Sequence, residues 1–91
     1  MADRIARELV IHGRVQGVFF RAFVRDAAQR AGVAGRAENR PDGTVLVRLE
    51  GPPDAVAQVQ RACRQGPEGA EVARVDARFA DVEGLSEFSV G

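Results

Sequence analysis

Lysine, tryptophan and tyrosine are absent from the 91 residues of this chain, and cysteine and histidine occur once each. Without lysine, no side-chain amine can act as a Schiff-base former, a phosphate ligand or a general base. A single cysteine, Cys63, excludes an intrachain disulfide. One cysteine and one histidine also cannot assemble the usual zinc site of Cys and His ligands. Arginine supplies all 13 basic residues, so any cationic group of a binding site must be an arginine.

The chain also lacks a net charge of one sign and long apolar runs. Its 13 basic and 13 acidic residues give a formal net charge of +0, whereas a nucleic-acid-binding domain is normally strongly basic. No apolar stretch approaches the about 18 residues of a membrane span, and no signal-peptide pattern opens the chain. We therefore expect one cytoplasmic domain over residues 1–91, with no nucleic-acid or membrane partner. No sustained exposed apolar stripe demands a second copy, so we expect a monomer.

Alternation of apolar and polar side chains predicts strands with one buried face. The expected strands are residues 6–13, 34–40, 45–50, 72–79 and, as a short final strand, 88–90. In the first strand, Leu9 and Ile11 share the apolar side. In the fourth, the inward-facing residues are expected to be Ala73, Val75, Ala77 and Phe79.

Two further segments place apolar side chains at the spacing of helices. The first helix is expected over residues 20–31 and ends at Gly32. The second opens at Pro52-Pro53-Asp54, buries a stripe that includes Cys63, and stops at Gly66. The order β-α-β-β-α-β, followed by a short C-terminal strand, predicts an α+β fold of the ferredoxin-like kind. In that fold two helices cover one face of an antiparallel sheet.

The clearest functional signal lies between His12 and Val24. An apolar strand runs into a loop with two glycines, Gly13 and Gly17, and the loop opens directly into the first helix with Arg21 at its start. Glycines let backbone N–H groups turn inward, a helix start adds unpaired N–H donors, and arginine adds a planar cationic fork. This order predicts an anion site. The plain alternative is a strand-to-helix turn whose arginines face water.

The expected topology brings a second polar residue to the same place. The first and second strands run parallel with the third between them, so their carboxyl ends emerge at one edge of the sheet, about 10 Å apart. The first strand ends at Gly13 and the second near Asn39. We therefore expect Arg21 and Asn39 to face one cleft, which favours the anion site.

The run Gly13-Arg14-Val15-Gln16-Gly17-Val18-Phe19-Phe20-Arg21 resembles the signature of the acylphosphatases. Residues 35–39, followed by Asp42-Gly43-Thr44-Val45, are similar to that family's second motif. The resemblance extends over nearly the whole chain. It implies hydrolysis of small acyl phosphates to carboxylate and inorganic phosphate, without a metal, a cofactor or a covalent phosphoenzyme.

Carried over by position, the resemblance also implies roles for single residues. Arg21 and the loop amides would hold the phosphoryl group, the amides being those of Val15, Gln16, Gly17, Val18, Phe19 and Phe20. Asn39 would orient the attacking water, which suits an amide that offers both a donor and an acceptor. An acyl phosphate has a good leaving group, so positioning and charge stabilisation are the main requirements. Inorganic phosphate, the product, should bind the same site and inhibit.

Several roles stay open at this point. Arg14 is either a solvated loop arginine or a source of positive potential, and Gln16 either braces the loop or contacts the ligand. His12 fits a packed or solvent-facing strand end better than an acid or base. The chain ends Phe88-Ser89-Val90-Gly91, whereas the family commonly ends in arginine, which leaves a contribution of the C-terminus open.

Other functional classes fit less well. A non-catalytic module of the same fold that binds an anion or a small ligand is the main alternative to an enzyme. An RNA-recognition domain has the same order of elements but stacks bases on aromatic residues of its central strands; residues 44–50 contain none. A P-loop nucleotide site is excluded because no Gly-Lys-Ser/Thr follows the glycine loop.

Overall fold

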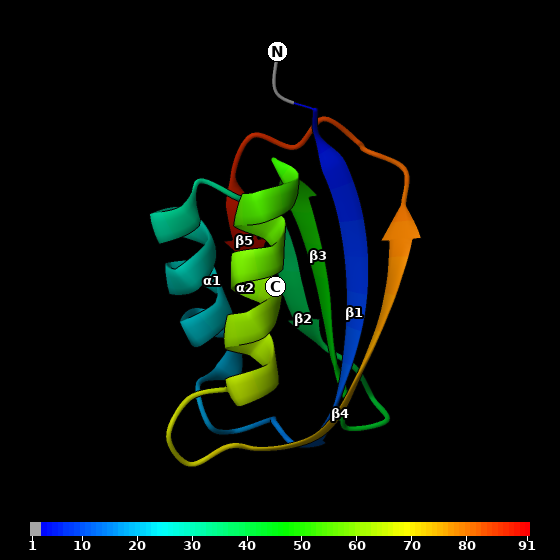
Figure 1. Cartoon of the computed structure of the whole chain (residues 1–91). Coiled ribbons are helices and arrows are strands. Elements are labelled where there is room, and N and C mark those ends of the chain that lie inside the picture. Colours follow the sequence, from blue (N-terminus) through cyan, green and yellow to red (C-terminus); the bar gives the residue numbers. More distant parts are fainter. Residues whose placement is uncertain (1–2) are drawn as a thin grey trace.

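Two helices pack on one face of a five-stranded sheet (Figure 1). The structure is a computed structural model that describes residues 3–91. Its elements are β1 (Ile5–Arg14), α1 (Phe20–Ala31), β2 (Ala34–Asn39), β3 (Val45–Gly51), α2 (Pro53–Gln65), β4 (Glu71–Ala80) and β5 (Phe88–Val90). The strand order is β4-β1-β3-β2-β5; β5 runs parallel to β2, and the other three pairs are antiparallel. The predicted ferredoxin-like fold is confirmed, with β5 making the sheet mixed.

The core forms between the helices and the inner face of the sheet. Strand residues Leu9 and Ile11 are 0% exposed, as the alternation predicts. The helices contribute Phe20, Val24, Ala28, Val56, Val59 and Cys63. Burial raises the pKa of the Cys63 thiol to about 12, so Cys63 stays neutral and packs as a small apolar side chain. Residues 3–91 contain two helices, and neither is long and apolar enough to cross a membrane.

Two of the β4 residues predicted to face the core, Ala73 and Phe79, are exposed. His12 pairs with Arg74 but Gly13 pairs with Val72, so Ala73 is an extra, exposed residue in a β-bulge. Phe79, expected in the core, is 71% exposed. It lies near the end of an edge strand that runs away from both helices (Figure 1), so nothing covers its ring except the Arg7 guanidinium, 4.4 Å from the ring centroid.

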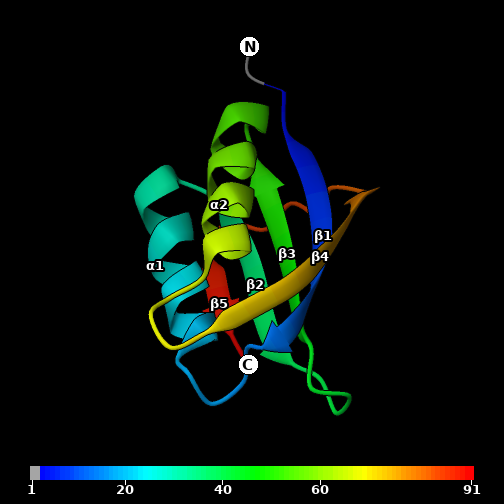
Figure 2. The same cartoon turned by 60° about the horizontal axis from the view of Figure 1, so that its bottom comes forward.

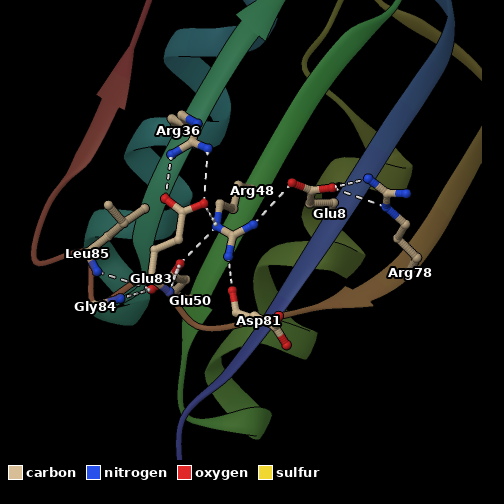
Figure 3. Close-up of polar contacts among 9 residues, drawn as sticks. All are labelled: Glu8, Arg36, Arg48, Glu50, Arg78, Asp81, Glu83, Gly84 and Leu85. Atoms are coloured by element: carbon tan, nitrogen blue, oxygen red, sulfur yellow. Dashed lines mark hydrogen bonds and ion pairs between the residues drawn. The ribbon is translucent and has the colours of Figure 1, made fainter.

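The other face of the sheet, which we call the open face, carries a network of charged side chains (Figure 3). Arg48 donates to Glu50 at 2.8 Å and to Glu8 at 3.1 Å. It also donates to the backbone oxygen of Asp81. Residues 81–87, the strap, connect β4 to β5. Arg48 holds the strap at Asp81, and Glu50 accepts hydrogen bonds from the N–H groups of residues 83–85. The strap thereby carries the end of the chain across the sheet to the far side of β2.

Candidate active site

The loop between β1 and α1 (residues 15–19) is tied to the turn between β2 and β3. Gln16 Nε2 donates to the backbone oxygen of Arg40 at 2.8 Å and to that of Thr44 at 2.9 Å. Both donor hydrogens of the amide are therefore used inside the protein. The sequence left two roles open for Gln16, bracing the loop or contacting the ligand. The structure shows that its side chain braces the loop. The brace fixes the loop relative to the end of β2.

The same loop presents a run of unpaired backbone donors. Within residues 3–91, no group accepts a hydrogen bond from the N–H of any residue from 15 to 22. The first N–H that is paired belongs to Phe23, which donates to the oxygen of Phe19 at 3.1 Å. Gly17 and Phe19 have φ values of 75° and 60°, in the left-handed region. Such residues between right-handed ones turn successive N–H groups toward one side, which forms an anion-binding concavity.

Glycine at position 13 is required where this loop leaves the sheet. Its φ is 128°, and a Cβ added there would lie 2.1 Å from the backbone oxygen of Glu71. Any side chain would push β1 and β4 apart at this point. The expectation that Gly13 serves the shape of the loop agrees with this close approach.

A cavity of about 320 Å³ lies between this loop, the start of α1 and the end of β2. Its lining residues are Val15, Gly17, Phe19, Phe20, Arg21, Ala22, Asn39 and Val90. Arg21 comes from the first turn of α1, and Asn39 is the last residue of β2. The structure thus brings Arg21 and Asn39 to one cavity, as the strand order predicts. Gln16 and Val18, also expected to contribute their amides, are not among the residues that line it.

The electrostatic field of the cavity favours an anion. Arg21 is the only charged side chain among the described residues that line it, and no Asp or Glu side chain is present there. The unpaired N–H groups and the amino end of α1 add partial positive charge at the same place. Together they provide what a tetrahedral phosphoryl group needs: several N–H donors around its oxygens and one planar cation.

The chain end takes part in this site. Arg21 Nη1 donates to the backbone oxygen of Gly91 at 3.0 Å, and Val90 lines the cavity. Figure 2 shows β5, which leads to this end of the chain, beside β2, the strand that ends in Asn39. Sequence reasoning left this contribution open, because residues 90 and 91 carry no polar side chain that would reveal it. The contact limits the orientations that the Arg21 guanidinium can adopt.

Two other basic residues of the signature region lie outside the cavity. His12 Nε2 is 3.0 Å from Asp76 Oδ2, across the β1–β4 pair. Arg74 Nη2 lies 3.2 Å from the same histidine nitrogen. Arg14 is exposed and does not line the cavity. His12 is therefore occupied by surface partners, which agrees with the expectation that it is neither acid nor base.

A metal centre has no evident ligands. In the part of the chain that the structure describes, residues 3–91, no group of three His, Cys, Asp or Glu side chains could hold a metal ion. The cavity offers one amide and one guanidinium as its polar side chains. Its positive field therefore comes from Arg21 and the backbone.

Comparison with known proteins gives a consistent assignment. The family model described as Acylphosphatase matches residues 7–90. An acylphosphatase from Gloeobacter violaceus is 47% identical over 90 residues, which are 99% of this chain and 97% of that relative. The crystal structure of acylphosphatase from Bacillus subtilis superposes with a TM-score of 0.93 at 33% identity, over 96% of this chain and 98% of the other. The structure of an acylphosphatase from Coxiella burnetii superposes with a TM-score of 0.94 at 30% identity, over 98% of this chain and 94% of the other.

Proposed function

This chain belongs to the acylphosphatase family, the hydrolases of acyl phosphates, and on that premise we propose how its residues divide the work. Arg21 and the backbone N–H groups of residues 15–20 hold the phosphoryl group. Asn39 orients the water that attacks phosphorus. The observation that carries this assignment is the run of unpaired N–H groups in the loop beside the cavity that Arg21 and Asn39 share.

The reaction needs few catalytic groups. Water forms a bond to phosphorus while the bond between phosphorus and the bridging oxygen breaks, which yields a carboxylate and inorganic phosphate. The carboxylate is a good leaving group and requires no general acid. No Asp, Glu or His side chain of the described residues lines the cavity, so the proton of the attacking water passes to a phosphoryl oxygen. Positioning and stabilisation of negative charge then supply the acceleration.

Asparagine suits the water-positioning role on chemical grounds. Its side-chain oxygen can accept a hydrogen bond from water and its NH₂ group can donate one, so a single amide can fix the water's direction. Asn39 ends β2, and the brace from Gln16 to the next turn holds that strand end against the loop. We propose that this brace sets the spacing between the oriented water and the phosphoryl group.

A direct assay tests the proposal. The protein should hydrolyse benzoyl phosphate, show little activity on the phosphate monoester p-nitrophenyl phosphate, and keep its activity after exhaustive treatment with EDTA. Inorganic phosphate should inhibit competitively. Activity that disappears with EDTA and returns with Mg²⁺ would contradict the mechanism. Phosphate binding without turnover would support the non-catalytic binding module instead.

We also propose that one copy of the chain is sufficient. The residues of a single chain are enough to form the cavity, and the partner that it needs is the small acyl phosphate. Size-exclusion chromatography at the enzyme concentration used in the assay should therefore show a monomer that carries the activity.

A further inference from the structure

The side chain of Phe19 lines the cavity and is largely exposed to solvent. It is 86% exposed, and the other exposed large hydrophobic residues within residues 3–91 are Phe79, Val82 and Val90, at 71%, 43% and 39%. Two of these four, Phe19 and Val90, line the same cavity. Phe79 is instead stacked under the Arg7 guanidinium. Exposed apolar side chains are therefore concentrated at the cavity that the proposed function uses.

The backbone of Phe19 adds a second, independent observation. Its φ of 60° and ψ of 28° place it in the left-handed region, and among residues 3–91 no other non-glycine residue has a positive φ. A bulky side chain is disfavoured there, and packing cannot compensate the cost because the ring is exposed. Uncompensated strain of this kind is typical of functional sites.

The cavity has two chemically different parts. Its polar part consists of Arg21, Asn39 and the loop N–H groups. The other lining side chains are apolar, and two of them, Phe19 and Val90, are exposed to solvent; we call these exposed apolar residues the rim. An acyl phosphate has the same two parts, a charged phosphoryl group and an acyl group. With the phosphoryl group on the N–H groups and Arg21, the acyl group must leave the polar part across the rim.

We propose that Phe19, together with Val90, forms an acyl-binding rim that selects acyl phosphates with flat, apolar acyl groups. The aromatic ring offers its face to such a group and removes apolar surface from water on both sides. A charged acyl group gains no partner at the rim, since Arg21 is the only charged side chain among the described residues that line the cavity and the phosphoryl group engages it. This inference rests on the proposed function, because it takes the phosphoryl group to lie at Arg21.

Binding of two stable analogues tests the rim separately from turnover. Benzoylphosphonate and acetylphosphonate carry a P–C bond in place of the labile bond and differ only in the acyl group. Wild-type protein should bind benzoylphosphonate more tightly. Phe19→Ala should remove most of that preference, which is about a tenfold fall in the ratio of the benzoylphosphonate affinity to the acetylphosphonate affinity. With benzoyl phosphate as substrate, the loss should appear in KM.

Two further variants distinguish the effect of losing the Phe19 ring from an effect on the shape of the loop. Phe19→Asn removes the ring but tolerates the left-handed backbone better, so it should lose the same preference with the loop intact. Phe79→Ala removes another exposed ring, which does not line the cavity, and should change the affinity for neither phosphonate. An unchanged preference in Phe19→Ala would overturn the proposal. So would an equal loss for both phosphonates and for inorganic phosphate, which would assign Phe19 to loop shape alone. If wild-type protein discriminates between the analogues but hydrolyses no acyl phosphate, the rim stands and the proposed hydrolysis fails.

Discussion

Replacing Glu50 by glutamine is expected to destabilise the fold by releasing the strap. Glu50 is 0% exposed. It accepts hydrogen bonds from Arg48 Nε at 2.8 Å and from the N–H groups of Glu83, Gly84 and Leu85 at 2.9, 3.1 and 3.1 Å (Figure 3). Glutamine keeps the length of the side chain but has one acceptor oxygen and no charge. Arg48 then loses its closest anionic partner, and at least one strap N–H loses its acceptor.

The pKa of Glu50 gives the size of the effect. Burial alone would raise this pKa, but the N–H of Glu83, the Arg48 guanidinium and the next two strap N–H groups together hold it at about 2, below the ordinary 4.5. The difference between the two values corresponds to roughly 3 kcal/mol of folding free energy. Because the folded-state pKa lies below the unfolded one, this contribution is present above about pH 4.5 and is lost as the pH falls toward 2.

Unfolding experiments can measure this contribution. At pH 7, Glu50→Gln should lower the free energy of unfolding by about 3 kcal/mol, or the melting temperature by about 10–20 °C for a domain of this size. At pH 3 the gap between wild type and variant should shrink to less than half. Glu38→Gln on β2 is the matched control, because the Glu38 side chain has no hydrogen-bond partner within residues 3–91. Equal stability at pH 7, or a gap that stays constant down to pH 3, would refute the reasoning.

Further predictions concern the cavity. Arg21→Lys keeps the charge but loses the planar fork, so turnover should fall about a hundredfold or more; near-normal kcat/KM on benzoyl phosphate would show that Arg21 supplies only positive potential. Asn39→Ala should keep its affinity for inorganic phosphate in calorimetry while kcat collapses, whereas Arg21→Ala should lose both. Melting curves should show both alanine variants folded, and full turnover in Asn39→Ala would end its assignment as the water-positioning residue.

The apolar periodicity of the sequence predicts most of the fold because each element buries one face. The first helix is expected over residues 20–31, and α1 spans Phe20–Ala31. The second is expected to open at Pro52-Pro53 and stop at Gly66, and α2 spans Pro53–Gln65. Strand order then places Arg21 and Asn39 together, since two parallel strands with an antiparallel one between them end at the same edge.

The predictions that were wrong and those left open share a physical cause. Each depends on the length, register or backbone position of a neighbouring element, which local side-chain pattern does not determine. Alternation predicts Phe79 as an inward-facing residue, but it carries no information on how far along β4 the helices extend. Ala73 is exposed because a bulge shifts the register between β1 and β4. The role of Gln16 could not be predicted because its partners are backbone oxygens of another turn. The contact between Arg21 and Gly91 could not be predicted either, because it uses a backbone oxygen and not a side chain of Gly91.

The distribution of charge explains how a chain with a formal net charge of +0 presents a positive cavity. Several carboxylates pair with arginines on or near the open face, where Glu8 contacts Arg48 and Arg78 and Glu50 contacts Arg48. The cavity lies on the helix side, and among the described residues no Asp or Glu side chain lines it beside Arg21. Net charge bears on long-range attraction of a polyanion such as nucleic acid. A small phosphoryl group responds instead to the donors within hydrogen-bond reach, and in the proposed site these are the Arg21 fork and the unpaired N–H groups of the loop.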